Sequence, residues 1–205
     1  MIQNGVTTKT PQNIPFGAGV YFKGVKYDEK VAPTEEEIKA AIFGATEDGG
    51  TTTITPEFFY VPADDVMVDL EELVQKVREE AMMEVSFLEI TPEYIKNQVI
   101  GKISQTTDGQ YDVITSDDHV RSGHFYQGFG YYGRHLDGRP MIIIFKKALC
   151  TSGHVGENKP KKNGVFKGTF KCHSDLEYGT TRLPYAIFIR KAEGWTPVNA
   201  DEVAV

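Results

Sequence analysis

Short runs of β-branched and aromatic residues, each ended by Gly, Pro, Asn or Asp, recur along this chain and constrain its fold more than any other feature. Such runs are typical of strands, and helical periodicity is found in few places. With 205 residues, of which 40% are hydrophobic, the chain is long enough to bury a large core, and we expect one domain over residues 1–205. The pattern predicts a mostly β fold, a sandwich or barrel of two packed sheets flanked by a short α-helix.

The same sequence argues against a membrane or secreted protein. No apolar run approaches the ~20 residues that a helix needs to cross a bilayer. The first residues (MIQNGVTTKTPQN) lack the basic and apolar regions of a secretory signal, so we expect a soluble protein resident in a cytosol. Cys150 and Cys172 lie inside apolar, strand-like runs, which indicates two buried thiols rather than a disulfide or a metal site.

One short helix is predicted in the segment TEEEIKAAIFG. Thr34 is suited to cap it, the glutamates of the first turn suit the helix dipole, and Gly44 is expected to stop it. Its core-facing stripe is expected to comprise Ile38, Ala41 and Ile42.

A second helix is predicted in TPEYIKNQVIG, with Thr91 as N-cap, Pro92 at the first helical position and Gly101 at the exit. A strand is expected to run directly into it, because apolar residues alternate just upstream. The inward residues are expected to be Ala81, Met83, Val85 and Phe87 on the strand, and Ile95, Val99 and Ile100 on the helix.

The segment from residue 123 to 151 predicts two strands joined at Asp137-Gly138, whose small residues accept the positive φ angles of a tight turn. The second strand is almost wholly apolar, so residues 141–145 are expected to be buried on both faces. Further strands are expected in GVFKGTFKCHSD and LPYAIFIRKA.

Acidic residues are concentrated between Glu57 and Glu93, where eleven carboxylates face only two basic residues. This stretch has a net charge of −9, whereas the rest of the chain sums to +2. A fold that gathered it on one face would repel polyanions there. Spacing leaves residues 68–80 open between a helix and a hairpin, with Glu71 and Glu72 exposed in either case.

Enzyme and cofactor sites find little support in the sequence. The string from Gly128 to Gly133 matches the dinucleotide fingerprint, but an aromatic strand continues through it where a helix should open. Its glycines are better explained by a bulge or by the close approach of another backbone. The histidines lack zinc-like spacing, and no nucleophile elbow or phosphate loop is present. We therefore expect a non-enzyme without metal or cofactor.

Six stretches between about residues 13 and 190 follow one another in a recognisable order: NIPFGAGVYFKG, FGATEDGGTTTITPEFFYV, MMEVSFLEITPEYIKNQVIG, RPMIIIFKKALCT, GTFKCHSD and LPYAIFI. In this order they resemble the major tail tube proteins of long-tailed (siphovirus-type) bacteriophages, particularly those of Gram-positive hosts.

The resemblance implies a structural virion protein that is assembled in the host bacterial cytoplasm and resides in the virion tail. Its hexameric rings would stack into a hollow tube through which DNA passes without tight binding. Its other partners would be the tape measure, tail terminator and baseplate or distal tail proteins. Residues 1–13 and 195–205 are expected to be extended or mobile ends that pack on neighbouring subunits or stay mobile.

The resemblance also suggests roles for the charged residues. An acidic lumen would avoid the tight DNA binding that neutralised phosphates bring. The expected lumen-facing residues are Glu79, Glu80 and Glu84. The expected contacts between rings or loops are Asp64, Asp65, Glu71, Glu72, Lys159, Lys161 and Lys162.

Three alternatives remain open at this point. A related tube, baseplate or tail-terminator component would share the fold but not open-ended polymerisation. A carbohydrate-binding or adhesion module would need exposed aromatic residues on one face, and a small hydrolase would need measurable turnover. The aromatic residues available for sugar stacking are Tyr126, Phe129, Tyr131, Tyr132 and Trp195.

Overall fold

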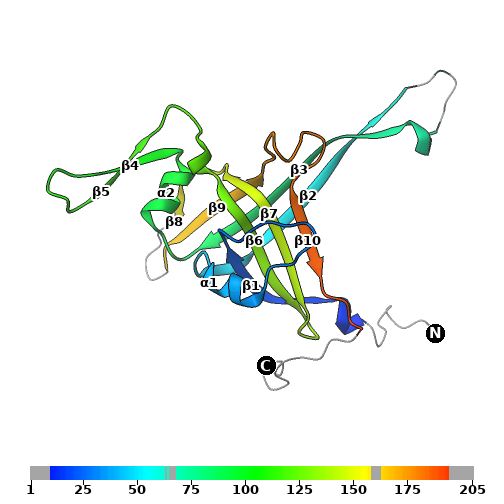
Figure 1. Ribbon diagram of the computed structural model, residues 1–205, viewed down its shortest axis with the longest axis horizontal. Helices are drawn as coiled ribbons and strands as arrows, with labels where there is room; N and C mark the ends of the chain where they lie inside the picture. The colour runs from blue at the N-terminus through cyan, green and yellow to red at the C-terminus, as the bar shows by residue number, and fades with distance from the viewer. Residues whose placement is uncertain (1–9, 63, 65–67, 158–162, 194–205) are drawn as a thin grey trace.

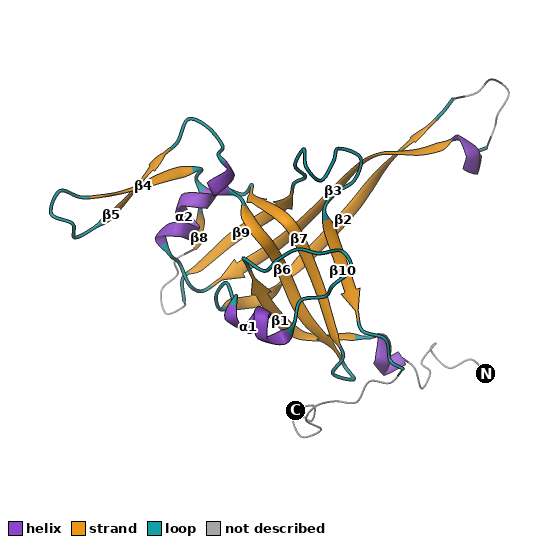
Figure 2. Cartoon of the chain, in the orientation of Figure 1, coloured by secondary structure: helices purple, strands orange, loops and turns teal. Residues whose placement is uncertain are grey.

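The computed structural model describes residues 10–62, 64, 68–157 and 163–193. It is mostly β, with 49% strand and 12% helix, which confirms the predicted fold class. The strands form one large curled sheet with a small hairpin beside it (Figures 1 and 2). The strands are β1 (Pro15–Phe22), β2 (Thr46–Tyr60), β3 (Val74–Phe87), β4 (Gly101–Gln105), β5 (Asp112–Ser116), β6 (Tyr126–His135), β7 (Pro140–Cys150), β8 (Val155–Glu157), β9 (Val165–Cys172) and β10 (Tyr185–Ile189). The helices are α1 (Glu35–Ala40) and α2 (Pro92–Gln98), with 3₁₀ turns η1 (Thr10–Asn13), η2 (Glu71–Leu73) and η3 (Ser122–His124).

The main sheet has the order β1-β6-β7-β9-β3-β2, with β10 paired to the first half of β7 and β8 paired to β9. All of these pairs are antiparallel. The sheet curls until its ends meet, since a Cβ atom on Gly50 of β2 would lie 2.3 Å from the Tyr21 hydroxyl of β1. The two halves of one sheet therefore face each other across a core, as in a barrel.

The interior of the curled sheet is an aromatic core. The rings of Phe129 and Phe170 stack with centroids 4.3 Å apart, and Phe43 meets Phe87 edge to face at 4.8 Å. Edge-to-face and offset ring pairs of this kind stabilise a core in addition to the stabilisation that comes from burying their apolar surface. The predicted alternation on β3 is confirmed, because its inward residues are all buried: Ala81, Met83, Val85 and Phe87.

A second apolar cluster covers the outer face of β7. Ile142 and Ile144 pack there with Phe22, Val25 and Ile38, the last of which comes from α1. Ile143 and Phe145 point to the aromatic core on the other face. The prediction that this segment is buried on both faces is confirmed, and the covering layer is α1 with the loop before it.

Helix α1 begins as predicted but ends early. The Thr34 hydroxyl accepts from the Glu37 amide, and the Glu37 carboxylate accepts from the Thr34 amide, which forms a capping box. The helix ends at Ala40 rather than at Gly44, because Ile42 leaves it to form a backbone bridge with Phe22. Ile38 is buried as expected, but Ile42 is exposed, so the predicted stripe was wrong at that residue.

Helix α2 has the predicted start and a different inward face. The Thr91 hydroxyl caps it, and Pro92 occupies its first turn. The expected inward stripe was wrong: Val99 is 37% exposed, and the buried residues are Tyr94, Asn97 and Gln98. The Tyr94 ring packs against Phe87 and Phe43, which fixes the rotation of this seven-residue helix. The positive φ at its exit falls on Ile100 (51°) rather than on Gly101.

The glycines of the aromatic string lie within the continuous strand β6, as predicted. Gly128 has a φ of +52°, and a Cβ atom there would lie 1.6 Å from the Val25 carbonyl oxygen. A Cβ atom on Gly130 would lie 2.4 Å from the Phe22 ring. The close approach of the Val25 backbone explains Gly128, and that of the Phe22 ring explains Gly130. Gly138 completes the predicted turn with a φ of 82°.

The two cysteines are buried and unbonded, which confirms the prediction of buried thiols. Burial raises the pKa of the Cys172 thiol to about 12. Among the described residues, no helix is long and apolar enough to cross a membrane.

Candidate assembly surfaces

Strands β2 and β3 continue as a two-stranded arm beyond the rest of the sheet (Figure 1). Strand β9 pairs with β3 only from Met82 to Phe87, whereas the pairing of β2 with β3 extends to Tyr60 and Val74. Residues 68–80, which the sequence left open, are therefore the 3₁₀ turn η2 and the first half of a strand. Of the two alternatives for this segment, a helix or a hairpin, the structure has the hairpin.

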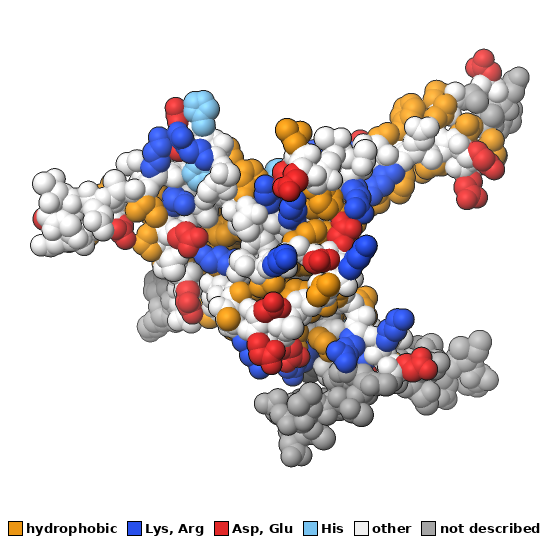
Figure 3. All heavy atoms as spheres, viewed as in Figure 1, with side chains coloured by type: hydrophobic (Ala, Val, Ile, Leu, Met, Phe, Trp, Pro, Cys, Tyr) orange, Lys and Arg blue, Asp and Glu red, His pale blue; other side chains and the backbone are white. Residues whose placement is uncertain are grey.

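The arm exposes large apolar side chains. Phe58, Phe59 and Tyr60 are 50%, 50% and 51% exposed, and Val77 across from them is exposed as well. A two-stranded ribbon has no second layer, and no other described element covers either of its faces. Figure 3 shows the resulting apolar surface along the arm. Exposed patches of this kind mark contact surfaces for other molecules.

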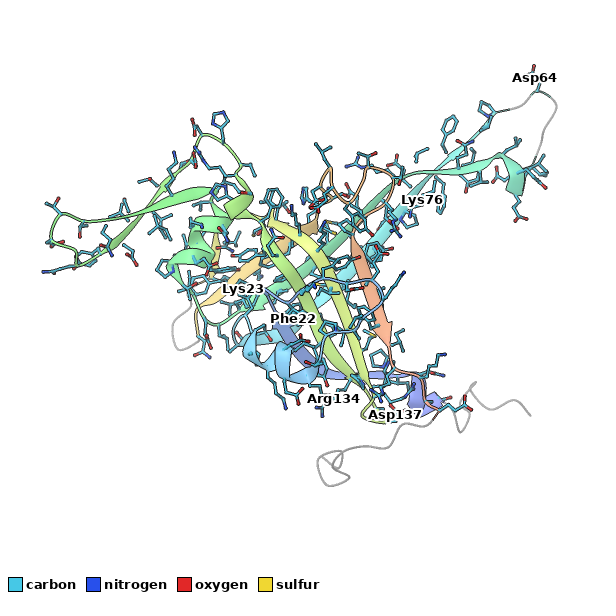
Figure 4. The ribbon with its side chains drawn as sticks, viewed as in Figure 1. Phe22, Lys23, Asp64, Lys76, Arg134 and Asp137 are labelled. Carbon is cyan, nitrogen blue, oxygen red and sulfur yellow. The ribbon has the colours of Figure 1, made fainter. Side chains whose placement is uncertain are left out.

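The tip of the arm is acidic. Glu71 and Glu72 form η2, and Asp64 lies at the far end (Figure 4). Lys76 is the first basic residue that follows them along the chain. Three of the predicted inter-ring residues, Asp64, Glu71 and Glu72, are thus brought together at this tip. Asp65 and the three lysines of the 158–162 segment lie outside the described residues.

The three predicted lumen residues do not share one face of β3. Glu79 lies two residues before Ala81, so its side chain points to the inward face of β3. This side chain is only 10% exposed, and its carboxylate accepts a hydrogen bond from the Tyr185 hydroxyl at 3.1 Å. Lys76 pairs with the same carboxylate at 2.7 Å. Glu80 and Glu84 point to the opposite face, as the alternation requires. Of the three predicted lumen residues, only Glu80 and Glu84 therefore lie on one surface.

The face of Glu80 and Glu84 is polar, and the strand register defines its members, since directly opposed residues share a face. Among them, three carboxylates (Glu57, Glu80, Glu84) are matched by three cations (Arg78, Lys167, Lys171). The described carboxylates of the acidic stretch are thus divided among the tip, this balanced face, the inward Glu79 and the region of α2, where Glu93 pairs with Lys23 at 2.8 Å. The polar face comprises Thr51, Thr53, Thr55 and Glu57 on β2, Arg78, Glu80, Met82, Glu84 and Ser86 on β3, and Lys167, Thr169 and Lys171 on β9.

Ion pairs hold the charges of this polar face. The Lys171 ammonium and the Arg78 guanidinium each lie 2.7 Å from the same Glu80 oxygen. The hydrogen bond from Lys171 lowers the pKa of Glu80, with a smaller contribution from Arg78. Glu80 therefore stays ionised and neutralises part of the positive charge of β9.

Several strands have an edge without a strand partner within the described part of the chain. Strands β1 and β2 end the main sheet, β10 has β7 on one side only, and β8 has β9 on one side only. Ile187 and Ile189 on β10 are exposed. Unpaired edges with exposed apolar residues favour pairing with another chain.

The described aromatic residues that were candidates for sugar stacking do not form an exposed platform. Tyr126 and Phe129 are buried, and Tyr131 packs against the aromatic core. Tyr132 packs against the second apolar cluster. Trp195 lies outside the described residues. The aromatic residues that are exposed lie instead on the arm and at Tyr111.

Two features were missed by the sequence analysis. One is the hairpin of β4 and β5, which projects away from the core at the opposite end from the arm (Figure 1). Its Asp108-Gly109 turn, with Gly109 at φ 68°, is a signal that could have revealed it. The other is a pocket beside α1, which no local pattern indicates.

The described residues contain no group of three or more His, Cys, Asp or Glu side chains placed to hold a metal ion. No protein-family model and no curated protein matches this chain.

Proposed function

We propose that this chain is a structural subunit of a hollow tube built from stacked rings, of the kind that forms the tail tube of long-tailed bacteriophages. The observation that carries the proposal is the arm. It extends a strand pair beyond the folded core and exposes Phe58, Phe59 and Tyr60, which nothing in the described part of the chain covers. The tube would be assembled in the host cytoplasm and end in the virion tail, beside tape measure, terminator and baseplate proteins.

Ring closure would use the unpaired strand edges. A ring of identical subunits needs two different surfaces that complement each other, so that each subunit contacts the next head to tail. The free edges of β2 and β10 supply two such surfaces. The arm, with its apolar shaft and acidic tip, then supplies the separate surface that stacking of rings requires.

The polar face of β2, β3 and β9 is the surface that we assign to the lumen, with Glu80 and Glu84 on it. Tight DNA binding arises from unpaired cations that displace counterions from phosphates. On this face, Lys167 and Lys171 are balanced by carboxylates, so a passing polyanion meets no net positive charge. Glu79 is left out of this assignment, because its carboxylate lies on the other face of β3.

Negative-stain electron microscopy of concentrated protein tests the proposal. We expect hollow tubes or rings, and we expect the double substitution Phe58→Ser and Phe59→Ser to abolish stacking while the fold is retained. The control is Ile103→Ser on β4, an exposed apolar residue away from the arm, which should leave tubes intact.

The possible outcomes distinguish related functions. Single closed rings that never stack would favour a terminator or baseplate component. Monomers at every concentration, with or without the arm substitutions, would contradict the proposal.

A further inference from the structure

The tip of the arm holds carboxylates without cationic partners. All of them are exposed, and none forms an ion pair with a described cation: Asp64, Asp69, Glu71 and Glu72. The cations that follow on β3, Lys76 and Arg78, pair with carboxylates nearer the core, Glu79 and Glu80. Four like charges that are gathered in this way repel one another and attract a cationic surface.

The shaft of the arm is apolar on both of its faces. Phe58 pairs with Lys76 and Tyr60 pairs with Val74, so these two aromatic residues share one face of the ribbon. Phe59 lies between them in the sequence and points to the other face. All three aromatic side chains are half exposed, and Figure 3 shows the apolar shaft next to the acidic tip. A surface that receives the arm therefore needs apolar side chains next to cations.

The end of β10 has this combination. Ile187 and Ile189 point to the same side of the strand and are 46% and 58% exposed. Arg190 and Lys191 follow directly, are exposed, and form no ion pair with a described carboxylate. With Glu193, residues 187–193 have a net charge of +1, whereas the described residues from 64 to 72 have a net charge of −4.

The spacing of charge and apolar surface is similar on the two sides. On the arm, Glu72 lies two residues from Val74, the partner of Tyr60. On β10, Lys191 lies two residues from Ile189. Two residues span at most about 7 Å, so the ion pairs and the apolar contacts can form at the same time.

The arm does not make this contact within its own chain. The Tyr185 hydroxyl, at the start of β10, donates to the Glu79 carboxylate at the base of the arm. From this contact the arm and β10 extend in different directions (Figure 1). The acidic tip and the end of β10 are therefore separated in one chain, and a second copy has to supply the arm.

We propose that the arm of one copy docks on the end of β10 of a second copy, with its aromatic side chains against Ile187 and Ile189 and its carboxylates against Arg190 and Lys191. The contact uses side chains, so the backbone edge of β10 stays free for a neighbour in the same ring. Because the two surfaces differ, every copy can both give an arm and receive one, and the contact repeats along a stack. The inference rests on the proposed tube, since it names the surface that the arm meets when rings stack.

Charge reversal on the two surfaces tests the docking. The tip variant is Glu71→Lys with Glu72→Lys, and the end variant is Arg190→Glu with Lys191→Glu. Each variant alone brings like charges together, so we expect the amount of sedimenting tube to fall at least about tenfold. An equal mixture of the two variants should restore tubes, because each tip then finds an end of opposite charge. Sedimentation velocity and negative-stain electron microscopy measure both effects.

The matched control is Lys26→Glu with Lys30→Glu, which reverses two exposed cations in the loop before α1. This variant should form tubes alone, and it should not restore tubes when it is mixed with the tip variant. If a charge reversal unfolds the protein, as judged by circular dichroism, the corresponding glutamine substitutions should give a smaller loss in the same direction.

The outcomes separate the docking from the tube. Tubes from either variant alone, a mixture that stays unassembled, or rescue by the control variant would overturn the docking and leave the tube proposal standing. Chains of copies that never become hollow tubes, but follow the same charge dependence, would support the docking and contradict the tube. Unmodified protein that is monomeric at every concentration would contradict both.

Discussion

The Lys171 ammonium of β9 lies 2.7 Å from the Glu80 carboxylate of β3, on the face that we assign to the lumen. This pair shows how the face can carry lysines without an excess of positive charge. The cations are present, but the carboxylates of the same three strands equal them in number. The net charge of the face, rather than the acidity of single residues, then decides whether the face attracts or repels a polyanion.

Removing two of these carboxylates should create a DNA-binding surface. The double substitution Glu80→Gln and Glu84→Gln leaves three cations against one carboxylate, a net charge of +2 on the polar face. We expect measurable double-stranded DNA binding at low salt that weakens steeply as salt is added, because phosphate neutralisation releases counterions. Fluorescence anisotropy of a labelled duplex across a salt series measures it.

The matched control is Glu71→Gln with Glu72→Gln, which changes the net charge by the same amount at the tip of the arm. This variant should bind DNA much more weakly than the polar-face variant. Equal binding by the two would mean that total charge, and not the polar face, governs contact with DNA.

Gly128→Ala should destabilise the fold severely. The backbone φ of +52° disfavours any side chain, and the added Cβ atom would lie 1.6 Å from the Val25 carbonyl oxygen. Strain and a displaced loop together are expected to cost about 4 kcal/mol or more of unfolding free energy. Urea denaturation followed by circular dichroism measures the loss, and insoluble expression would agree with it.

Gly123→Ala is the comparison for this prediction, since a Cβ atom there meets nothing within 4 Å. It should change the unfolding free energy by less than about 1 kcal/mol. Similar losses at the two positions would show that the contact with the Val25 carbonyl is not what requires glycine in β6.

Some elements of the fold could be predicted because the structure that the local sequence favours is also the one that the packing of the whole chain requires. On β3, a period of two places Ala81, Met83, Val85 and Phe87 on one face, and the sheet buries that face in the half of the strand beyond the arm. The caps at Thr34 and Thr91 are equally local, because each depends only on the residues of the next turn.

Other features depend on packing that no local pattern contains. Helix α2 is too short for its aliphatic stripe to decide its rotation, and the ring of Tyr94 does so by entering the aromatic core. The sequence shows that the stretch is acidic, but it does not show how its carboxylates are distributed between the tip of the arm and the two faces of β3. That Glu80 contacts Lys171 and Glu79 contacts Tyr185 follows from how β3 is placed against β9 and β10, which are distant in the sequence.

The Asp175 ion pairs should make stability depend on pH in the acid range. The hydrogen bond from Lys147 holds the pKa of Asp175 well below its usual value, with help from the Tyr178 amide and Lys146. A carboxyl whose pKa is lower in the folded state stabilises the fold above its unfolded pKa of about 3.9. That stabilisation is lost as the pH falls through the lower, folded value.

Asp175→Asn should therefore lower the melting temperature at pH 7, and the difference from the unmodified protein should narrow as the pH falls below about 4. Thermal unfolding by circular dichroism at a series of pH values measures this. Glu177→Gln, at an exposed neighbour in the same loop, should give no such pH-dependent difference. If the difference in melting temperature between Asp175→Asn and the unmodified protein stayed constant from pH 7 to the acid range, lost packing rather than lost charge would be the cause of the destabilisation.

The two thiols should be unreactive in the folded protein. Burial raises the pKa of both Cys150 and Cys172, the latter to about 12, so the thiolate that reacts with disulfide reagents is scarce as well as inaccessible. We expect a chromogenic disulfide reagent to label neither cysteine at pH 8 within minutes, and to label both after denaturation in guanidinium. Rapid labelling of the native protein would show that the sheet opens between β7 and β9, where Cys172 is paired with Ala148 and Cys150 with Phe170.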